Sequence, residues 1–121
     1  MTIHYTADHE WIAIEGDVAT VGITEHAQSL LGDLVFVQLP DVGKEVEKGA
    51  EAAVVESVKA ASEVFAPLSG TIIEINASVS ADPALVNSDP VGAGWLFKLR
   101  FSEPVEISTL LSKIAYQATL R

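Results

Sequence analysis

Short apolar segments separated by glycine, proline or asparagine run along most of this chain, and they constrain its fold more than any other feature. Runs rich in valine, isoleucine and phenylalanine between such turn residues are typical of β-strands. We therefore expect a mainly β protein, and 121 residues suit one domain spanning residues 1–121. The expected strands are residues 11–14, 18–23, 34–39, 50–55, 61–65, 71–75 and 95–101.

Two features indicate how these strands connect. Residues 11–14 and 18–23 flank Glu15-Gly16-Asp17, which predicts a hairpin with a three-residue loop. A weak internal similarity relates residues 32–37 to residues 70–75, because each begins with a glycine that precedes an apolar run. Two such strand-turn units favour a flattened barrel or sandwich with approximate two-fold symmetry.

A short helix is expected at residues 25–31. Thr24 can cap its N-terminus, and Gly32 can end it in the left-handed conformation. Its predicted apolar face comprises Ala27, Leu30 and Leu31.

The remainder of the chain is less regular. Residues 76–94 contain two prolines and two glycines and are expected to form an irregular crossing loop. Ser102 can cap a C-terminal helix that breaks near Ser112. Its predicted apolar face comprises Ile107, Leu110, Leu111 and Ile114.

Charge and composition narrow the possible functions. Seventeen acidic residues oppose seven basic ones, for a net charge of -10, so nucleic acid and anionic membranes are not expected partners. The charge either steers the chain toward basic protein surfaces or only maintains solubility. The chain has no cysteine, which excludes disulfides and thiolate chemistry.

Sequence signals for targeting and for metal binding are weak. The first Lys or Arg is Lys44, and no apolar run is long enough to cross a bilayer. A cytoplasmic location is expected, or the mitochondrial matrix if a leader was removed. His4, His9 and His26 lack the spacing of metal ligands, so no metal site is expected.

Lys59 is the residue most suggestive of chemistry. It lies between the strands expected at 50–55 and 61–65, and no other Lys or Arg occurs between Lys48 and Lys98. A lysine at a hairpin tip extends its flexible stem into solvent, where an enzyme could acylate the amine. From composition alone, a plain turn lysine that keeps the loop soluble is the simpler interpretation.

The wider pattern resembles the H-protein family of the glycine cleavage system across nearly the whole chain. The matching residues are His9-Glu10-Trp11, Val21-Gly22-Ile23-Thr24, Ala27-Gln28, Leu31-Gly32-Asp33, Val35-Phe36-Val37, Leu39-Pro40, Gly43, Glu56-Ser57-Val58-Lys59-Ala60, Pro67-Leu68-Ser69-Gly70, Asn76, Pro83, Asn87, Pro90, Gly94-Trp95 and Leu110-Leu111. The resemblance implies the lipoyl/biotinyl-type barrel-sandwich hybrid, with two small sheets.

The resemblance also implies that Lys59 bears lipoate through an amide, and that Glu56 and Gly70 help the lipoylating enzyme recognise the site. Biotin carriers share a related fold but typically flank their lysine with methionines. This chain has no methionine after Met1, which favours lipoate.

The implied function is that of a shuttle without catalysis of its own. It would carry an aminomethyl group from pyridoxal-phosphate-dependent glycine decarboxylase to a tetrahydrofolate-dependent aminomethyltransferase, and dihydrolipoyl dehydrogenase would then reoxidise the arm. A lipoate ligase or lipoyl transferase would attach the group. The alternatives are an H-like lipoate relay for other enzymes and a non-lipoylated acidic binding module.

A cleft for the loaded arm is implied near His9-Glu10-Trp11. Our hypothesis is that the Glu10 carboxylate pairs with the amine of the arm and that Glu63 helps to shape the cleft. Asp8 and Glu63 depart from some members of the family, which have a small polar residue and a shorter acid at these positions. The alternative is that Glu10 is a surface acid and that Trp11 serves only in packing.

Overall fold

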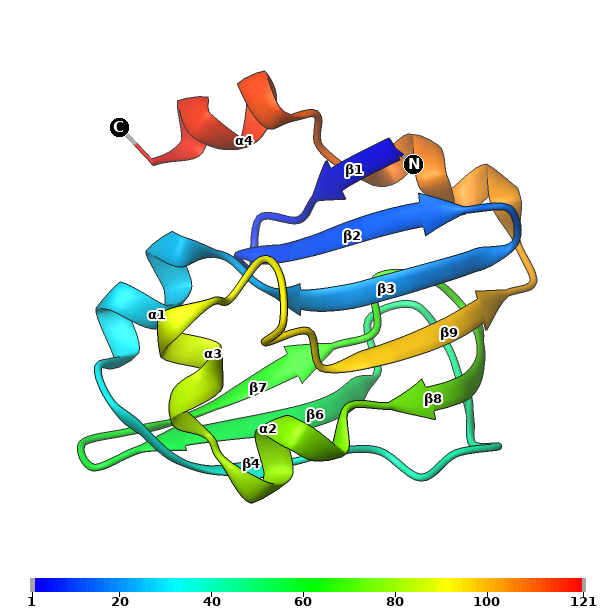
Figure 1. Cartoon of the computed structure of the whole chain (residues 1–121). Helices are drawn as coiled ribbons and strands as arrows, with labels where there is room; N and C mark the ends of the chain where they lie inside the picture. Colours follow the sequence, from blue (N-terminus) through cyan, green and yellow to red (C-terminus); the bar gives the residue numbers. More distant parts are fainter. Residues whose placement is uncertain (1, 121) are drawn as a thin grey trace.

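The computed structural model describes residues 2–120 and consists of two antiparallel sheets with short helices at their ends (Figure 1). One sheet has the strand order β1-β2-β3-β9-β8-β5, and the other has the order β4-β6-β7. The expected mainly β fold with two sheets is therefore confirmed. The strands are β1 (Thr2–Tyr5), β2 (Glu10–Glu15), β3 (Val18–Ile23), β4 (Leu34–Gln38), β5 (Glu45–Val46), β6 (Glu51–Ser57), β7 (Ala61–Phe65), β8 (Gly70–Ile75) and β9 (Phe97–Phe101).

The core lies between the two sheets. Val21, Phe97 and Leu99 are buried from the larger sheet, and Val55 and Val64 are buried from the smaller one. Burying these side chains is the main favourable contribution to folding. Only one face of the three-stranded sheet faces this core.

The hairpin between β2 and β3 is tighter than expected. Glu15 pairs with Val18, so the loop consists of Gly16 and Asp17 alone, and the prediction of a three-residue loop was wrong. Gly16 has a φ of 63°, which a two-residue hairpin turn commonly demands and which glycine adopts without a steric penalty. Strand β1, which was not expected, pairs with β2 on its other side.

Helix α1 (Glu25–Leu31) is confirmed, but its details differ from expectation. The hydroxyl of Thr24 accepts the Ala27 N–H at 3.2 Å, as an N-cap does. Gly32 has a φ of 81° but a ψ of -161°, so the helix does not end in the left-handed helical conformation. Leu30 is 60% exposed and does not belong to the packed face.

The stretch at residues 76–94 is not an irregular loop, because it contains α2 (Ala77–Ala81) and α3 (Ala84–Ser88). Asn76 caps α2, and its amide also donates to the carbonyls of Ala93 and Trp95. Each helix buries a single residue, Val79 or Val86. Because each helix buries only one residue, its sequence shows no repeat of apolar residues at helical spacing, so neither helix was predictable.

The C-terminal segment divides into two helices. A 3₁₀ helix (η1, Pro104–Thr109) is followed by α4 (Lys113–Thr119), so the break near Ser112 is confirmed. Ser102 does not cap a helix; its hydroxyl donates to the Ser69 carbonyl, and Ser112 is the N-cap of α4. Ile114 is exposed, and Tyr116 is the buried residue of α4.

Strand bounds elsewhere differ by a few residues. Residues 61–65 form β7 as predicted, whereas the strand expected at 50–55 runs from Glu51 to Ser57. Within residues 2–120, none of the helices combines the length and apolar character needed to cross a bilayer.

Candidate functional site

Lys59 lies at the tip of the hairpin formed by β6 and β7. Glu56 pairs with Ala61, and the Ser57 N–H donates to the Ala60 carbonyl at 2.8 Å. The buried hydroxyl of Ser57 also accepts the N–H groups of Lys59 at 3.3 Å and Ala60 at 3.1 Å. The turn is therefore held by its own hydrogen bonds, while the Lys59 side chain is exposed.

The stem of Lys59 lies against Gly32, where a Cβ atom would be 3.6 Å from the lysine Cε. The side chain of Asn87 holds the backbone around Gly32 in place by hydrogen bonds. Its side-chain oxygen accepts the Leu34 N–H at 2.9 Å, and its amide donates to the Gly32 carbonyl at 2.9 Å and to Gln28. Asn87 matched the family pattern, but its contact with Gly32, which lies beside the lysine stem, was not predictable from the sequence.

The two residues expected to aid lipoylation are not brought together. Glu56 is half-buried beside the tip, whereas Gly70 begins β8 at the opposite end of the molecule (Figure 1). A Cβ atom on Gly70 would lie 2.2 Å from the carbonyl oxygen of Arg100. The close pairing of β8 with β9 therefore requires glycine at position 70, independently of any role of this residue in recognition by the lipoylating enzyme.

Glu10 lies in a cavity of about 260 Å³ and is only 2% exposed, so the alternative of a surface acid was wrong. Its carboxylate accepts the Phe65 N–H at 2.8 Å and the Thr6 hydroxyl at 3.0 Å. Burial raises the pKa of Glu10 to about 7, against the opposing effect of these hydrogen bonds and of Lys48. The cavity is lined by Thr6, Ala7, Asp8, Glu10, Lys48, Gly49, Phe65, Ala66, Pro67, Thr109, Leu110 and Leu111.

Trp11 is buried and packs in the core, as the alternative interpretation of this segment expected. Its ring covers Gly22, where a Cβ atom would approach the indole nitrogen to 2.6 Å. The indole N–H donates to the Pro90 carbonyl at 2.8 Å.

His9 faces away from the cavity and makes a separate network. Its backbone has a φ of 67°, which is unusual for a residue other than glycine. The Nδ1 atom lies 2.8 Å from the Tyr116 hydroxyl, which is also 2.7 Å from the Thr24 hydroxyl. Burial and the neighbouring His26 lower the pKa of His9. Sequence reasoning missed Tyr116, for which no local signal exists.

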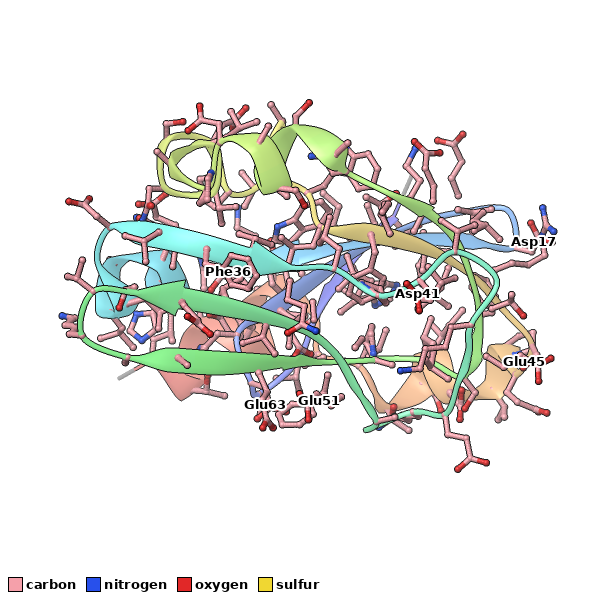
Figure 2. The ribbon with its side chains drawn as sticks, turned by 90° about the horizontal axis from the view of Figure 1, so that it is seen from below. Asp17, Phe36, Asp41, Glu45, Glu51 and Glu63 are labelled. Atoms are coloured by element: carbon pink, nitrogen blue, oxygen red, sulfur yellow. The ribbon has the colours of Figure 1, made fainter. Side chains whose placement is uncertain are left out.

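Glu63 does not line the cavity. It lies on β7 opposite Val54, two residues before Phe65, and its side chain is exposed (Figure 2). The structure therefore places Glu10, Glu63 and His9 in three different surroundings. Within residues 2–120, no three His, Asp or Glu side chains gather in a way that could hold a metal ion.

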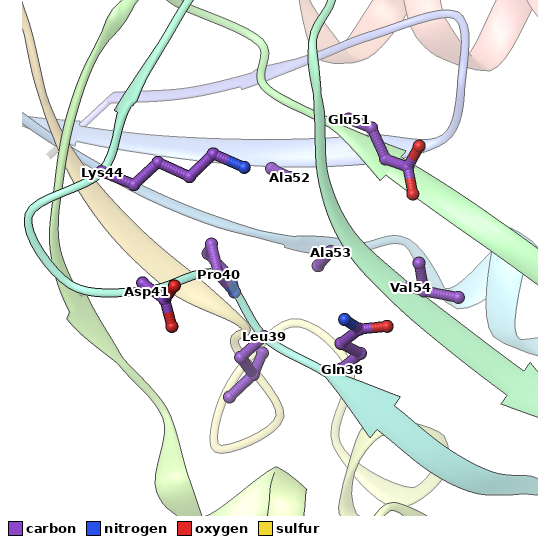
Figure 3. A pocket seen from close by; sticks show the side chains of 9 residues that line it. All are labelled: Gln38, Leu39, Pro40, Asp41, Lys44, Glu51, Ala52, Ala53 and Val54. Carbon is purple, nitrogen blue, oxygen red and sulfur yellow. The ribbon is translucent and has the colours of Figure 1, made fainter.

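A second hollow, of about 320 Å³, lies at the end of β4 away from the tip (Figure 3). Lys44 extends across it toward Ala52, and Asp41 and Glu51 lie at its edges. It contains none of the predicted site residues.

A solved structure supports the assignment of the fold. A glycine cleavage system H protein from Mycobacterium marinum matches with a TM-score of 0.86 and 43% identity, over 98% of this chain and 95% of that one. Its barrel-sandwich fold confirms the expected fold class. The fold and the lysine at the tip of its hairpin define a small carrier protein of the lipoyl type.

Sequence comparisons identify the family. The glycine cleavage H-protein model matches residues 3–121. Curated proteins named glycine cleavage system H protein are 57% identical in Xanthobacter autotrophicus, over 96% of this chain and 93% of the relative, and 56% identical in Bradyrhizobium diazoefficiens, over 97% and 96%. The chain belongs to the glycine cleavage H-protein family, and it is the non-catalytic carrier component of that system.

Proposed function

We propose that Lys59 is the attachment site of the lipoyl group and that residues 1–121 form a single lipoyl-carrier domain. The observation that carries this proposal is the exposed amine on a hydrogen-bonded turn, in a stretch with no other Lys or Arg from residue 49 to 97. The residues present fit the group, because the amine is accessible to a modifying enzyme and only the flexible lysine stem needs to move.

The chain's own residues would hold the base of the lipoyl arm in a rigid turn and extend the arm into solvent. When bound, the lipoyl group supplies the sulfur that carries the aminomethyl unit. Ser57 holds the turn from which that arm extends, and the lysine stem passes beside Gly32. Tethering a reactive group to a fixed point raises its local concentration at each active site that the carrier visits.

The proposed partners are those of the glycine cleavage system. They are glycine decarboxylase, the aminomethyltransferase and dihydrolipoyl dehydrogenase, together with a lipoate ligase or lipoyl transferase. Since the relatives named above are bacterial, we propose a bacterial cytoplasmic location.

We further propose that Glu10 stabilises the loaded arm. Its carboxylate is almost completely buried in the lining of a cavity that is also lined by Asp8 and Lys48. An ammonium group brought into contact with Glu10 would offset the cost of burying its charge. Glu63 lies on the same strand as Phe65, along the direction from Lys59 toward the cavity.

Replacing Lys59 with arginine tests the attachment site. The carrier is incubated with lipoate ligase and then with glycine decarboxylase, and glycine–bicarbonate exchange and intact mass are measured. Lys59→Arg should show no lipoyl mass increment and no exchange, because a guanidinium does not form the amide. Lys44→Arg is the matched control and should behave like the wild type. Full exchange by Lys59→Arg would show that Lys59 is not the attachment site.

A further inference from the structure

Among residues 2–120, Lys48 is the one residue that lines both the Glu10 cavity and a neighbouring acidic hollow. Of the described residues around the Glu10 cavity, Lys48 is the only cation, and Asp8 and Glu10 are the only acids. The acidic hollow has a volume of about 750 Å³ and is lined by four glutamates, Glu45, Glu47, Glu103 and Glu106. Lys48 therefore stands between a buried carboxylate and a group of acids near the surface.

The backbone of Lys48 is fixed, while its side chain is free to turn. Its N–H donates to the Ser69 hydroxyl at 2.9 Å, and the N–H of Gly49 donates to the Ala66 carbonyl at 2.8 Å. Ser69 is held in turn by the Glu106 carboxylate, which accepts both its N–H and its hydroxyl. The Lys48 side chain is exposed and makes no ion pair among residues 2–120. Because its stem is flexible, the ammonium can move between the two hollows without any change in the backbone.

The unloaded carrier has a buried acid that requires a positive charge beside it. Burial raises the pKa of Glu10, and its hydrogen bonds with Phe65 and Thr6 lower the pKa without restoring the ordinary value. Asp8, which is exposed, raises the pKa further, whereas Lys48 lowers it. Before any other cation is present, Lys48 is thus the charged side chain that favours the ionised form of Glu10.

The amine of the loaded arm would compete with Lys48 for the same carboxylate. Two ammonium groups beside Glu10 would repel each other, because the cavity of about 260 Å³ offers only Asp8 as a second acid. Lys48 has another favourable position in the acidic hollow. Since four carboxylates line that hollow, the loss of any single one leaves it acidic.

We propose that Lys48 is the exchangeable counter-ion of Glu10: it faces Glu10 in the unloaded carrier and turns to the acidic hollow when the amine of the arm arrives. This proposal rests on the proposed role of Glu10 in receiving that amine. The exchange keeps a positive charge beside Glu10 in both states. It also makes Lys48 a competitor of the arm, so that the arm is held less tightly than Glu10 alone would hold it.

The pKa of Glu10 in the unmodified chain tests the pairing without lipoate. Wild type, Lys48→Met, Lys48→Arg and Lys44→Met are titrated, and the Glu10 carboxyl is followed by carbon NMR. Lys48→Met should raise the pKa of Glu10 by about 0.5, a threefold change in proton affinity that is typical of a partly exposed charge pair. Lys48→Arg should keep the wild-type value. Lys44→Met removes the same charge from a different hollow and should have no effect.

Breakdown of the loaded carrier tests the exchange. Release of formaldehyde and ammonia should be about threefold slower from Lys48→Met than from wild type, because the amine of the arm no longer competes with a lysine. Lys48→Arg and Lys44→Met should release at the wild-type rate. The hydrogen bond that fixes residue 48 comes from its backbone, so each variant retains it, and thermal denaturation shows whether each is folded.

Three results would overturn the proposal. An unchanged pKa of Glu10 in Lys48→Met would show that Lys48 is not its counter-ion. Unchanged or faster release from Lys48→Met would show that the lysine does not compete with the arm. A wild-type release rate from Glu10→Gln would overturn the proposed role of Glu10, and the exchange with it, even where the pKa of Glu10 responds to Lys48. Only this last result also removes the role of Glu10 on which the exchange rests.

Discussion

The Glu10 carboxylate accepts the backbone N–H of Phe65 at 2.8 Å and so joins the start of β2 to the end of β7. Phe65 lies six residues after Lys59 on the strand that leads away from the tip. The contact places a buried acid beside one strand of the hairpin that carries Lys59. The predictions below concern this acid and the residues that hold the surrounding structure.

Replacing Glu10 with glutamine should speed the breakdown of the loaded carrier. The amide keeps the size of the side chain but loses the charge that pairs with the ammonium group. A hydrogen bond to a charged group contributes about 1.5–3 kcal/mol, so release of formaldehyde and ammonia should accelerate about tenfold or more. Glu47→Gln, an exposed acid, is the control. Equal release rates in wild type and Glu10→Gln would remove Glu10 from the mechanism.

The unloaded protein should become less stable as pH rises from about 4.5 to about 7, in part because of Glu10. Its folded pKa of about 7 exceeds the ordinary value of 4.5, so the folded state binds more protons than the unfolded state in this range. The contribution of Glu10 is therefore fully present below pH 4.5 and is lost as pH rises through about 7, amounting to about 3 kcal/mol.

Chemical denaturation across this pH range measures that contribution. As pH rises, the free energy of unfolding of the wild type should fall relative to that of Glu10→Gln, because only the wild type has a titrating group at position 10. A difference that is constant with pH would contradict the raised pKa. In the loaded carrier the ammonium should lower the pKa of Glu10 and reduce the pH dependence.

Removing the hydroxyl of Tyr116 should destabilise the junction between α4 and the turn before β2. Tyr116→Phe removes the hydroxyl that pairs with His9 Nδ1 and with the Thr24 hydroxyl, which then keeps only the Ala27 N–H, and such a loss costs about 1–3 kcal/mol. Tyr5→Phe is the matched control, because the Tyr5 ring stacks on Tyr116 at 4.9 Å while its hydroxyl is outside the network. Urea denaturation compares the two, and equal stabilities would contradict the structural importance of the network.

Replacing Gly70 with alanine should destabilise the fold as well as impair lipoylation. The added Cβ would lie 2.2 Å from the Arg100 carbonyl oxygen, and the strands must separate to admit it. We expect a loss of at least about 2 kcal/mol, in the range of overpacking and backbone strain. Thermal unfolding and intact mass distinguish the two effects. Unchanged stability with lost lipoylation would show that Gly70 acts in recognition alone.

Local sequence signals were sufficient for much of the fold. Apolar runs between turn residues located every described strand except β1 and β5, and Thr24 marked the start of α1 correctly. They failed at residues 76–94, where α2 and α3 each bury one valine and show no amphipathic period. They also misplaced the C-terminal cap, because Ser102 and Ser112 are both competent caps and only the packing of the segment selects Ser112.

The hairpin with Lys59 at its tip was predictable because it is a local structure. Two short strands with one lysine between them form a turn held by hydrogen bonds within residues 57–60. The surroundings of Glu10 were decided only by the tertiary structure, since Phe65 and Lys48 are distant in the sequence and become neighbours when the sheets pack. Burial and hydrogen bonding depend on such long-range contacts, and they determine whether an acid is a solvated surface group or a buried carboxylate near neutral pKa.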